Sequence, residues 1–299
     1  MSFAFLWIPF VIVASLAQVA RNAMQRELTT SLGTIGATHV RFLFGFPFSI
    51  LFLAAVMAVT REIPAAPPVA FWLWLVMGTM TQIIATGLML AAMNERSFVV
   101  TTAYIKTEPI QAALFGFVFL ADHLTLAKMA AIVVATAGVV LTAIRPGGEK
   151  GFGSFRPTAL GLAAAAGFAL SAVGYRGAIL HVTGVSFVTA ASFTLVLGLM
   201  LQTIVLSAYL LLRDRTTLLA LFRMWRPSLL AGFLGAGASQ FWFLAFAITS
   251  VANVRTLALV EVLFAQAIAY YSMKQRISAR EAIGIVLIVL GVGALIAVQ

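Results

Sequence analysis

The sequence contains no cysteine and only three histidines in 299 residues. Without cysteine the chain has no disulfide, no thiolate nucleophile and no cysteine-ligated metal. His39, His123 and His181 all lie near the ends of predicted helices, where we interpret them as loop or interface residues. The sequence also lacks an HExxH motif, a GxSxG motif and a paired catalytic His and Asp. These absences argue against an enzyme and against a metal or other cofactor.

Charged residues are also scarce. They make up 9% of the chain and hydrophobic residues 62%, whereas a soluble domain has about 25% charged residues. Since this composition cannot build a water-facing surface, and the mean hydropathy is +1.07, we predict an all-α integral membrane protein in the lipid bilayer. The basic residues behind the net charge of +10 stand singly or in pairs between apolar runs, which does not suit nucleic acid.

Charged residues, proline and glycine divide the chain into apolar segments of about 20 residues, the length that spans a bilayer. The first segment has no Lys or Arg before its apolar run, so we interpret it as a helix and not as a signal peptide. The ten predicted transmembrane helices are 3–24, 34–59, 69–93, 97–120, 125–144, 156–180, 185–212, 227–248, 251–273 and 278–298.

The two halves of the chain resemble each other. A shift of 153 residues aligns residues 90–144 with 243–297 and matches Glu108 with Glu261. Because each half has an odd number of helices, the second enters the membrane from the opposite side, which predicts two inverted five-helix repeats. Carriers that work by alternating access have this arrangement. The predicted domains are a first repeat at 1–146, a linker loop at 147–155 and a second repeat at 156–299.

Two segments carry a resemblance to a known family. Residues 107–141 have the sequence TEPIQAALFGFVFLADHLTLAKMAAIVVATAGVVL, and residues 260–295 have the sequence VEVLFAQAIAYYSMKQRISAREAIGIVLIVLGVGAL. They resemble the Pro-bearing helix, polar turn and Gly-rich closing helix of ten-helix EamA-type members of the drug/metabolite transporter (DMT) superfamily. The family often has Glu in the turn, where this chain has Asp122 and Gln275, and Pro109 becomes Val262 in the second copy. The resemblance implies export or exchange of metabolites, prominently amino acids, and cytoplasmic termini.

The charge distribution predicts a different orientation. Cytoplasmic loops carry an excess of Lys and Arg. Loops after the odd-numbered predicted helices hold fourteen such residues, and loops after the even-numbered helices hold four: Arg61, Lys128, Arg176 and Arg255. The charge count therefore predicts that both termini lie outside. The protein is expected to be a multi-pass protein of the plasma membrane, the bacterial inner membrane.

Charged residues inside predicted helices are the first candidates for function, because each costs about 2.5–3.5 kcal/mol to insert at the centre of a membrane helix. Glu108 and Glu261 occupy equivalent places, and either could bind a proton or a substrate ammonium; capping a helix or pairing with a buried Arg is the alternative. Lys106 lies about 200° around a helix from Glu108, so we expect them on different faces. Lys106 could bind a substrate carboxylate or extend to the interface, and Arg255 could be a gate or a cap.

Two predicted helices carry polar residues on one face. Gln18, Arg21 and Asn22 stand at i, i+3 and i+4 of the first helix, a face that should line water. Arg21 is near the predicted helix end and could instead anchor it at the interface. In the third helix, Thr79, Gln82 and Thr86 form a similar polar face, for which hydrogen bonds between helices are the alternative explanation.

Aromatic, amide and hydroxyl side chains on other helices complete the predicted substrate cavity. Such a lining suits a small zwitterionic or partly apolar solute better than a phosphate, which requires clustered Arg or Lys. The residues are Tyr104, Ser171, Tyr175, Gln240 and Trp242. The remaining tryptophans are assigned to the membrane-interface belts: Trp7, Trp72, Trp74 and Trp225.

We therefore expect a secondary transporter that moves a small metabolite, foremost amino acids by efflux, through a central cavity between the repeats. The alternative within transport is an exchanger of larger polar metabolites such as sugar- or nucleotide-linked solutes. A channel is disfavoured because a pore needs no alternating halves. Proton coupling stays open, as does the choice between monomer and dimer.

Overall fold

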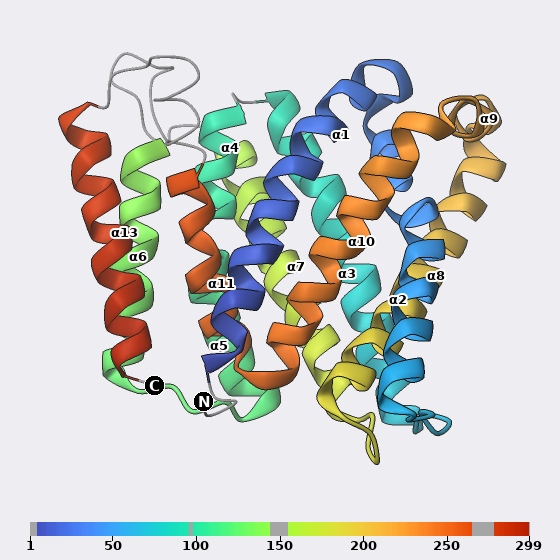
Figure 1. The fold of residues 1–299 in the computed structure, drawn as a ribbon. Coiled ribbons are helices and arrows are strands. Elements are labelled where there is room, and N and C mark those ends of the chain that lie inside the picture. The colour runs from blue at the N-terminus through green and yellow to red at the C-terminus, as the bar shows by residue number, and fades with distance from the viewer. Residues whose placement is uncertain (1–4, 96–97, 144–154, 265–277, 299) are drawn as a thin grey trace. The chain divides into compact units, whose positions relative to one another are not determined.

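The computed structural model describes residues 5–95, 98–143, 155–264 and 278–298, and none of these residues lies in a β-strand (Figure 1). The labelled α-helices are α1 (Trp7–Leu43), α2 (Gly45–Thr60), α3 (Val69–Glu95), α4 (Phe98–Ile105), α5 (Glu108–Leu120), α6 (Leu126–Ala143), α7 (Phe155–Leu180), α8 (Phe187–Arg213), α9 (Arg215–Arg223), α10 (Trp225–Ile248), α11 (Val251–Leu257) and α13 (Ala279–Ala297), with a 3₁₀-helix η2 at Ala258–Val260.

Several of these helices are apolar enough to cross a membrane. Within the described residues, six segments meet the length and hydropathy of a span: Leu32–Thr60, Val69–Met93, Phe155–Leu180, Phe187–Arg213, Trp225–Ile248 and Ala279–Ala297. Two shorter apolar helices lie at Trp7–Arg21 and Leu126–Thr142. The all-helical prediction therefore holds for the part of the chain that the structure describes.

The predicted end of the first helix, near residue 24, is wrong. The helix continues to a break at Gly33, whose φ of 64° and ψ of 178° are not helical. This backbone region is essentially restricted to glycine, because a Cβ would clash with the local backbone. Helical structure resumes at residue 34 and runs to Leu43, and α2 follows at Gly45. Gly33 therefore replaces the short loop that the sequence predicted between the first two spans.

The chain forms two compact units, and each unit combines segments from both sequence halves. The first unit comprises Met1–Met80 and Gly174–Thr249, and the second comprises Thr81–Val173 and Ser250–Gln299. Neither unit matches one sequence repeat. Each half of the chain therefore contributes to two packed cores.

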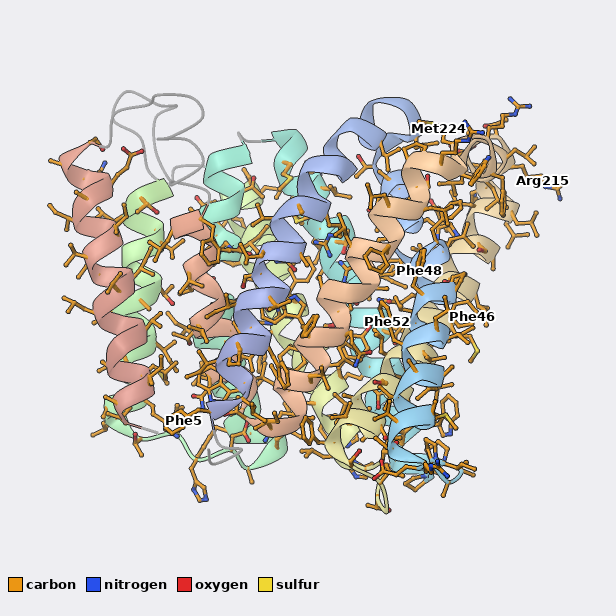
Figure 2. The ribbon with its side chains drawn as sticks, viewed as in Figure 1. Phe5, Phe46, Phe48, Phe52, Arg215 and Met224 are labelled. Carbon is orange, nitrogen blue, oxygen red and sulfur yellow. The ribbon has the colours of Figure 1, made fainter. Side chains whose placement is uncertain are left out.

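In the first unit, α1 packs along α10, while α2 packs against α8 and α10. The Phe10 and Phe241 rings lie 6.0 Å apart, and Arg21 lies against Gly235, so α1 and α10 run in opposite directions. A Cβ on Gly232 would lie 2.5 Å from the carbonyl carbon of Phe44, which explains the glycine there. Phe48 and Phe52, labelled on α2 in Figure 2, add aromatic contacts with α10.

The connection after α2 is tied to the start of α8 by Glu62. Its Oε2 accepts hydrogen bonds from the Ser186 hydroxyl (2.6 Å), the Thr189 hydroxyl (2.6 Å) and the Ser186 backbone N–H (2.9 Å). Ser186 is itself the N-cap of α8 and accepts from the Thr189 backbone N–H. The bonds from Ser186 and Thr189 lower the pKa of Glu62, because they stabilise its ionised form.

A short helix, α9, lies where the sequence predicted only a loop. Asp214 is its N-cap, and the carboxylate accepts hydrogen bonds from the Thr216 hydroxyl (2.6 Å), the Thr217 hydroxyl (2.6 Å) and the Thr217 backbone N–H (3.1 Å). These bonds, that from Thr216 first, lower the pKa of Asp214 to about 2. At nine residues, α9 is too short for a search based on spans of about 20 residues to find.

In the second unit, α6 and α13 lie side by side (Figure 1). A Cβ on Gly138 would lie 2.7 Å from the Gly284 carbonyl oxygen, and a Cβ on Gly291 would lie 2.8 Å from the Ala131 carbonyl oxygen. Residue numbers fall along α13 as they rise along α6, so the two helices are antiparallel. The 153-residue shift converts one contact into the other, since 138 corresponds to 291 and 131 to 284. Equivalent helices therefore make reciprocal contacts, as in a two-fold symmetric interface.

The first prediction concerns this close packing. Gly291→Ala is expected to destabilise the protein by about 1–3 kcal/mol, because the new methyl group overlaps the α6 backbone, with the Ala135 amide nitrogen 2.5 Å away. Gly293→Ala is the matched control in the same helix, since nothing lies within 4 Å of its added Cβ. The measurement is the fraction of monodisperse protein after heating in detergent. Equal stability of the two variants would contradict this packing.

The second prediction concerns the Glu62 carboxylate. Because folding lowers its pKa, its contribution to stability is present above the unfolded value of 4.5 and is lost as the pH falls through the lowered pKa. Glu62→Gln should therefore lower the melting temperature at pH 7, and the difference from wild type should shrink below pH 4.5. Arg61→Gln, at the exposed neighbouring residue, is the control. A difference that does not depend on pH would exclude the ionised carboxylate as its cause.

Candidate functional site

Two helices of the second unit are interrupted at equivalent positions. The first interruption separates α4 from α5 at Lys106 and Thr107, where Pro109 occupies the first turn of α5 and cannot donate a helical hydrogen bond. The second follows α11, where the chain tightens into η2 immediately before Glu261. Val262 replaces the proline there, consistent with a tightened turn in place of a full break. The sequence predicted both segments as continuous helices, which is wrong.

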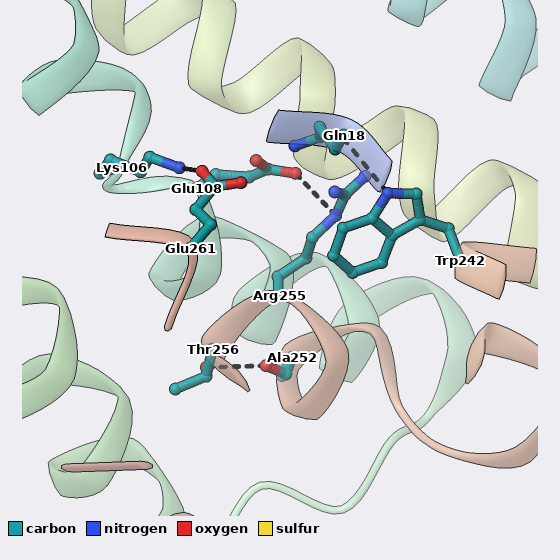
Figure 3. Close-up of polar contacts among 8 residues, drawn as sticks. All are labelled: Gln18, Lys106, Glu108, Trp242, Ala252, Arg255, Thr256 and Glu261. Carbon is teal, nitrogen blue, oxygen red and sulfur yellow. Dashed lines mark hydrogen bonds and ion pairs between the residues drawn. The ribbon is translucent and has the colours of Figure 1, made fainter. Parts of the chain in front are cut away.

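Two ion pairs lie at these interruptions (Figure 3). Arg255 Nε lies 2.9 Å from Glu108 Oε1, and Lys106 Nζ is paired with Glu261 Oε1. The four side chains are only 14–18% exposed. In each pair one partner comes from the first sequence half and the other from the second. Electrostatic attraction at these pairs therefore links the two repeats at the point where their helices are broken.

The helix interruption also changes the predicted relation between Lys106 and Glu108. The expectation that they face different sides assumed one continuous helix, but α4 ends at Ile105 and α5 begins at Glu108. Figure 3 shows the labelled Lys106, Glu108, Arg255 and Glu261 side chains grouped together. All four residues predicted from charge and repeat position thus form one cluster, which we call the charge cluster: Lys106, Glu108, Arg255 and Glu261.

Other polar candidates belong to the first unit. Trp242 Nε1 donates a hydrogen bond to Gln18 Oε1 at 3.2 Å (Figure 3), and Gln240 Nε2 donates to the Ser192 hydroxyl at 2.8 Å. Arg21 is buried against α10, close to Arg41, which favours an interior position over the interfacial anchor considered for it. The side chain of Asn22 lies outside the described residues.

The hydroxyls predicted to form polar faces mostly bond within their own helices. Thr79 is fully buried, and its hydroxyl donates to the Leu75 carbonyl at 2.7 Å. Thr86 likewise donates to the carbonyl oxygen of Gln82, which lies in the second unit. Such local bonds satisfy a threonine without a partner from another helix. The polar face of α3 is therefore no evidence of a substrate path by itself.

The remaining candidates are buried among aromatic and small residues. The Tyr104 hydroxyl lies 2.9 Å from the Thr158 hydroxyl, in the second unit. Ser171 is buried in the same unit, and its hydroxyl has no hydrogen-bond partner among the described residues. Tyr175 belongs to the first unit, where its ring lies 4.7 Å from the Phe243 ring. The structure therefore brings the charged candidates together but divides the uncharged ones between two units.

Sequence reasoning missed several buried polar residues. His39, interpreted as a loop or interface residue, is fully buried, and its Nε2 lies 2.8 Å from the Ser207 hydroxyl of α8. Arg176, counted among loop charges, donates to the carbonyls of Phe246 and Thr249 at the end of α10. A charged residue inside the apolar helix α7 was the available signal for Arg176. Nothing in the local sequence distinguished His39.

The assignment of four tryptophans to the membrane-interface belts is partly wrong. Trp7 is fully buried, so it does not belong to an interface belt. Trp72 and Trp225 are 39% and 47% exposed, as a belt residue would be. Trp74 is half-buried and packs against Gly177.

Comparison with known proteins identifies the family to which the chain belongs. The family model described as the EamA-like transporter family matches residues 5–144 and again residues 157–297. The chain belongs to the EamA-like transporter family. This EamA-like protein is accordingly a multi-pass membrane transporter of the DMT type, and the family implies a small-molecule solute.

Similarity to solved structures supports the fold of this EamA-like transporter. One structure, described as "Crystal structure of protein", is 16% identical, with a TM-score of 0.72 over 97% of this chain and 99% of that chain. At this identity the likeness concerns the fold alone. No curated protein matches the sequence. Among the described residues, no group of three or more His, Asp or Glu side chains is arranged to hold a metal ion.

The third prediction tests the charge cluster. Glu108→Gln leaves the Arg255 charge without its partner, which costs about 3–5 kcal/mol in a fully buried pair and less here because of the partial exposure. The double variant Glu108→Gln/Arg255→Gln should recover most of the lost stability, since it removes both charges. Thermal stability in detergent is the measurement. If the double variant is no more stable than the single one, the two side chains are not coupled.

Proposed function

We propose that this EamA-like transporter moves amino acids out of the cytoplasm by alternating access of two inverted five-helix repeats in the bacterial inner membrane. The observation that carries the proposal is the charge cluster, which joins the two repeats at their interrupted helices. The antiparallel, reciprocal packing of α6 and α13 supports inversion, because equivalent helices of inverted repeats run in opposite directions. If each helix that is interrupted at the charge cluster is counted as one span, the proposed fold has ten spans.

The chemistry of the charge cluster favours a zwitterionic solute. The cluster contains two carboxylates and two cations, so its formal charge is balanced. The ammonium group of an amino acid can replace a cation beside Glu108 or Glu261, and its carboxylate can replace a carboxylate beside Arg255. Each exchange keeps every charge paired, which avoids the large cost of an unpaired charge in a low-dielectric interior. A phosphorylated solute would bring two or more negative charges and leave the cluster unbalanced.

Interrupted helices suit such a site for a second reason. The N-terminus of α5 carries a partial positive charge. Glu108 lies in the first turn of this helix, where Pro109 has no N–H and the Ile110 N–H donates to the Thr107 carbonyl at 3.2 Å. Transporters use the ends of interrupted helices in this way to bind ionic groups near the membrane midplane. The α4–α5 interruption can therefore add the positive end of a helix dipole to the arginine as an attraction for a solute carboxylate.

The composition of the ion pairs supports alternating access. Each pair joins residues of different repeats, so movement of one repeat against the other must stretch or break it. A bound zwitterion can supply the missing partner during this movement and lower its barrier. The resemblance of residues 107–141 and 260–295 to segments of a family that exports or exchanges metabolites supports efflux as the direction.

The fourth prediction concerns transport itself. Full-length protein in proteoliposomes should exchange internal unlabelled amino acids for external labelled ones, and this counterflow should fall about 10- to 100-fold in Arg255→Gln and in Glu261→Gln, the loss expected for one charged contact. Arg61→Gln, an exposed residue outside the charge cluster, should transport normally.

The same assay tests proton coupling, the substrate class and the role of the charge cluster. A panel of amino acids is compared with and without a pH gradient, so that proton coupling appears as a dependence on the gradient. Counterflow of no amino acid would overturn the proposed substrate class. Unchanged transport by both cluster variants, with normal expression and monodispersity, would assign the cluster a purely structural role.

A further inference from the structure

The short helix α9 lies between two candidate membrane spans and is not used by the proposed transport site. It begins at Arg215, two residues after α8 ends at Arg213, and α10 begins at Trp225, two residues after α9 ends. Both α8 and α10 have the length and hydropathy of a span. Because spans end where the hydrocarbon core ends, α9 lies at the level of the lipid headgroups.

One side of α9 is packed into the first unit. Leu221 is fully buried and belongs to a core cluster with Leu28 and Leu32 of α1. Leu218 packs against the same cluster. The inward side of α9 is therefore fully accounted for by protein contacts.

The outward side of α9 combines apolar and basic residues. At 100° per residue, Arg215, Leu219, Phe222 and Arg223 fall within about 100° of one another around the helix. Leu219 is 59% exposed and Phe222 is 56% exposed, and both arginines are exposed. Figure 2 shows the labelled Arg215 side chain extending away from α9. In water, two large apolar side chains between two arginines would be an unfavourable surface.

Neighbouring residues extend this surface in both directions. Leu212 is 80% exposed at the end of α8, and Trp225 is 47% exposed at the start of α10. The Arg226 guanidinium lies 5.4 Å from the centre of the Trp225 ring. Arg213 and Arg226 are also exposed. We call this surface the α9 surface: Leu212, Arg213, Arg215, Leu219, Phe222, Arg223, Trp225 and Arg226.

The charge of the α9 surface is strongly one-sided. It contains four arginines, and the acidic residue between Leu212 and Arg226 is Asp214. The Asp214 carboxylate accepts hydrogen bonds from Thr216 and Thr217 at the start of α9. The side chains aimed outward therefore carry positive charge together with apolar bulk, which is the composition of helices that lie in the interface of anionic membranes.

We infer that α9 is an interfacial helix whose arginines bind the phosphate groups of anionic phospholipids in the surrounding bilayer. Leu219, Phe222 and Trp225 enter the boundary between headgroups and acyl chains, and Arg215 and Arg223 extend to the phosphates. Guanidinium groups bind phosphate through paired hydrogen bonds, which strengthens each contact. Because α9 lies between two candidate membrane spans, we take the bilayer to cover this surface. The loop also belongs to the set whose excess of Arg predicts a cytoplasmic location, where the leaflet is anionic.

The test uses Trp225 as a reporter of the lipids that touch α9. Full-length protein is reconstituted into vesicles in which either phosphatidylglycerol or phosphatidylcholine carries brominated acyl chains, at equal mole fractions. Bromine quenches only nearby tryptophans. The Trp225 signal is obtained as the difference between wild type and Trp225→Phe. Brominated phosphatidylglycerol is expected to quench this signal more strongly than brominated phosphatidylcholine.

Charge variants then identify the source of the preference. In Arg215→Gln/Arg223→Gln the relative binding constant for phosphatidylglycerol should fall about fivefold for each arginine removed. Arg215→Lys/Arg223→Lys should retain most of the preference, and Arg61→Gln should retain all of it. Salt should weaken the preference, because exposed charges are screened.

Three outcomes would overturn the inference. Equal quenching by the two lipids would mean that α9 contacts the bilayer without selecting lipids of net negative charge. Quenching by neither lipid would mean that α9 does not lie in the interface, as for a surface that binds another protein. A preference that survives in Arg215→Gln/Arg223→Gln would arise elsewhere in the molecule. Monodispersity of each variant, equal to that of the wild type, shows that it is folded.

Discussion

The pairing of charges inside apolar helices constrains the rest of this structure. Glu108 and Glu261 lie in segments that otherwise suit lipid, and each has a cation beside it from the opposite sequence half. A charge in such surroundings is tolerated only when an opposite charge or hydrogen bonds compensate it. The helix interruptions bring Lys106 and Arg255 within reach of these carboxylates. The two halves must therefore meet in three dimensions before either pair forms.

Close packing of two helices, one from each sequence half, brings the halves into contact. Along α6 and α13, Gly138 and Gly291 remove the side chains that would keep the backbones apart. Association of helices in lipid depends on such contacts because lipid chains are as apolar as leucine, so burying apolar side chains gains little. The reciprocal geometry of the two glycines mirrors the sequence repeat. Repetition in the sequence thus appears in the second unit as a pair of equivalent contacts.

Two kinds of hydrogen-bonded polar residue recur within the spans. Short hydroxyl side chains, such as those of Thr79 and Thr86, return to the backbone of their own helix. Longer amide and charged side chains reach a neighbouring helix, as Gln240 reaches Ser192. A polar face of threonines is therefore compatible with a dry helix interface, whereas glutamine, arginine and glutamate indicate specific partners. This difference explains why charge and repeat position were better guides to a cluster than polarity alone.

The sequence by itself determined the membrane character, the all-helical structure and the repeated family match, because hydropathy, helix length and internal similarity are properties of the chain read in order. It also identified all four members of the charge cluster, since each is a charge in an apolar segment. Only the tertiary structure decided which charges pair, that Lys106 and Glu108 share a cluster, and that His39 and Trp7 are buried. It also revealed α9, whose nine residues are too few for a spanning pattern. Those features depend on which helices become neighbours and where a helix breaks, and contacts between distant segments leave no periodic signal in the sequence.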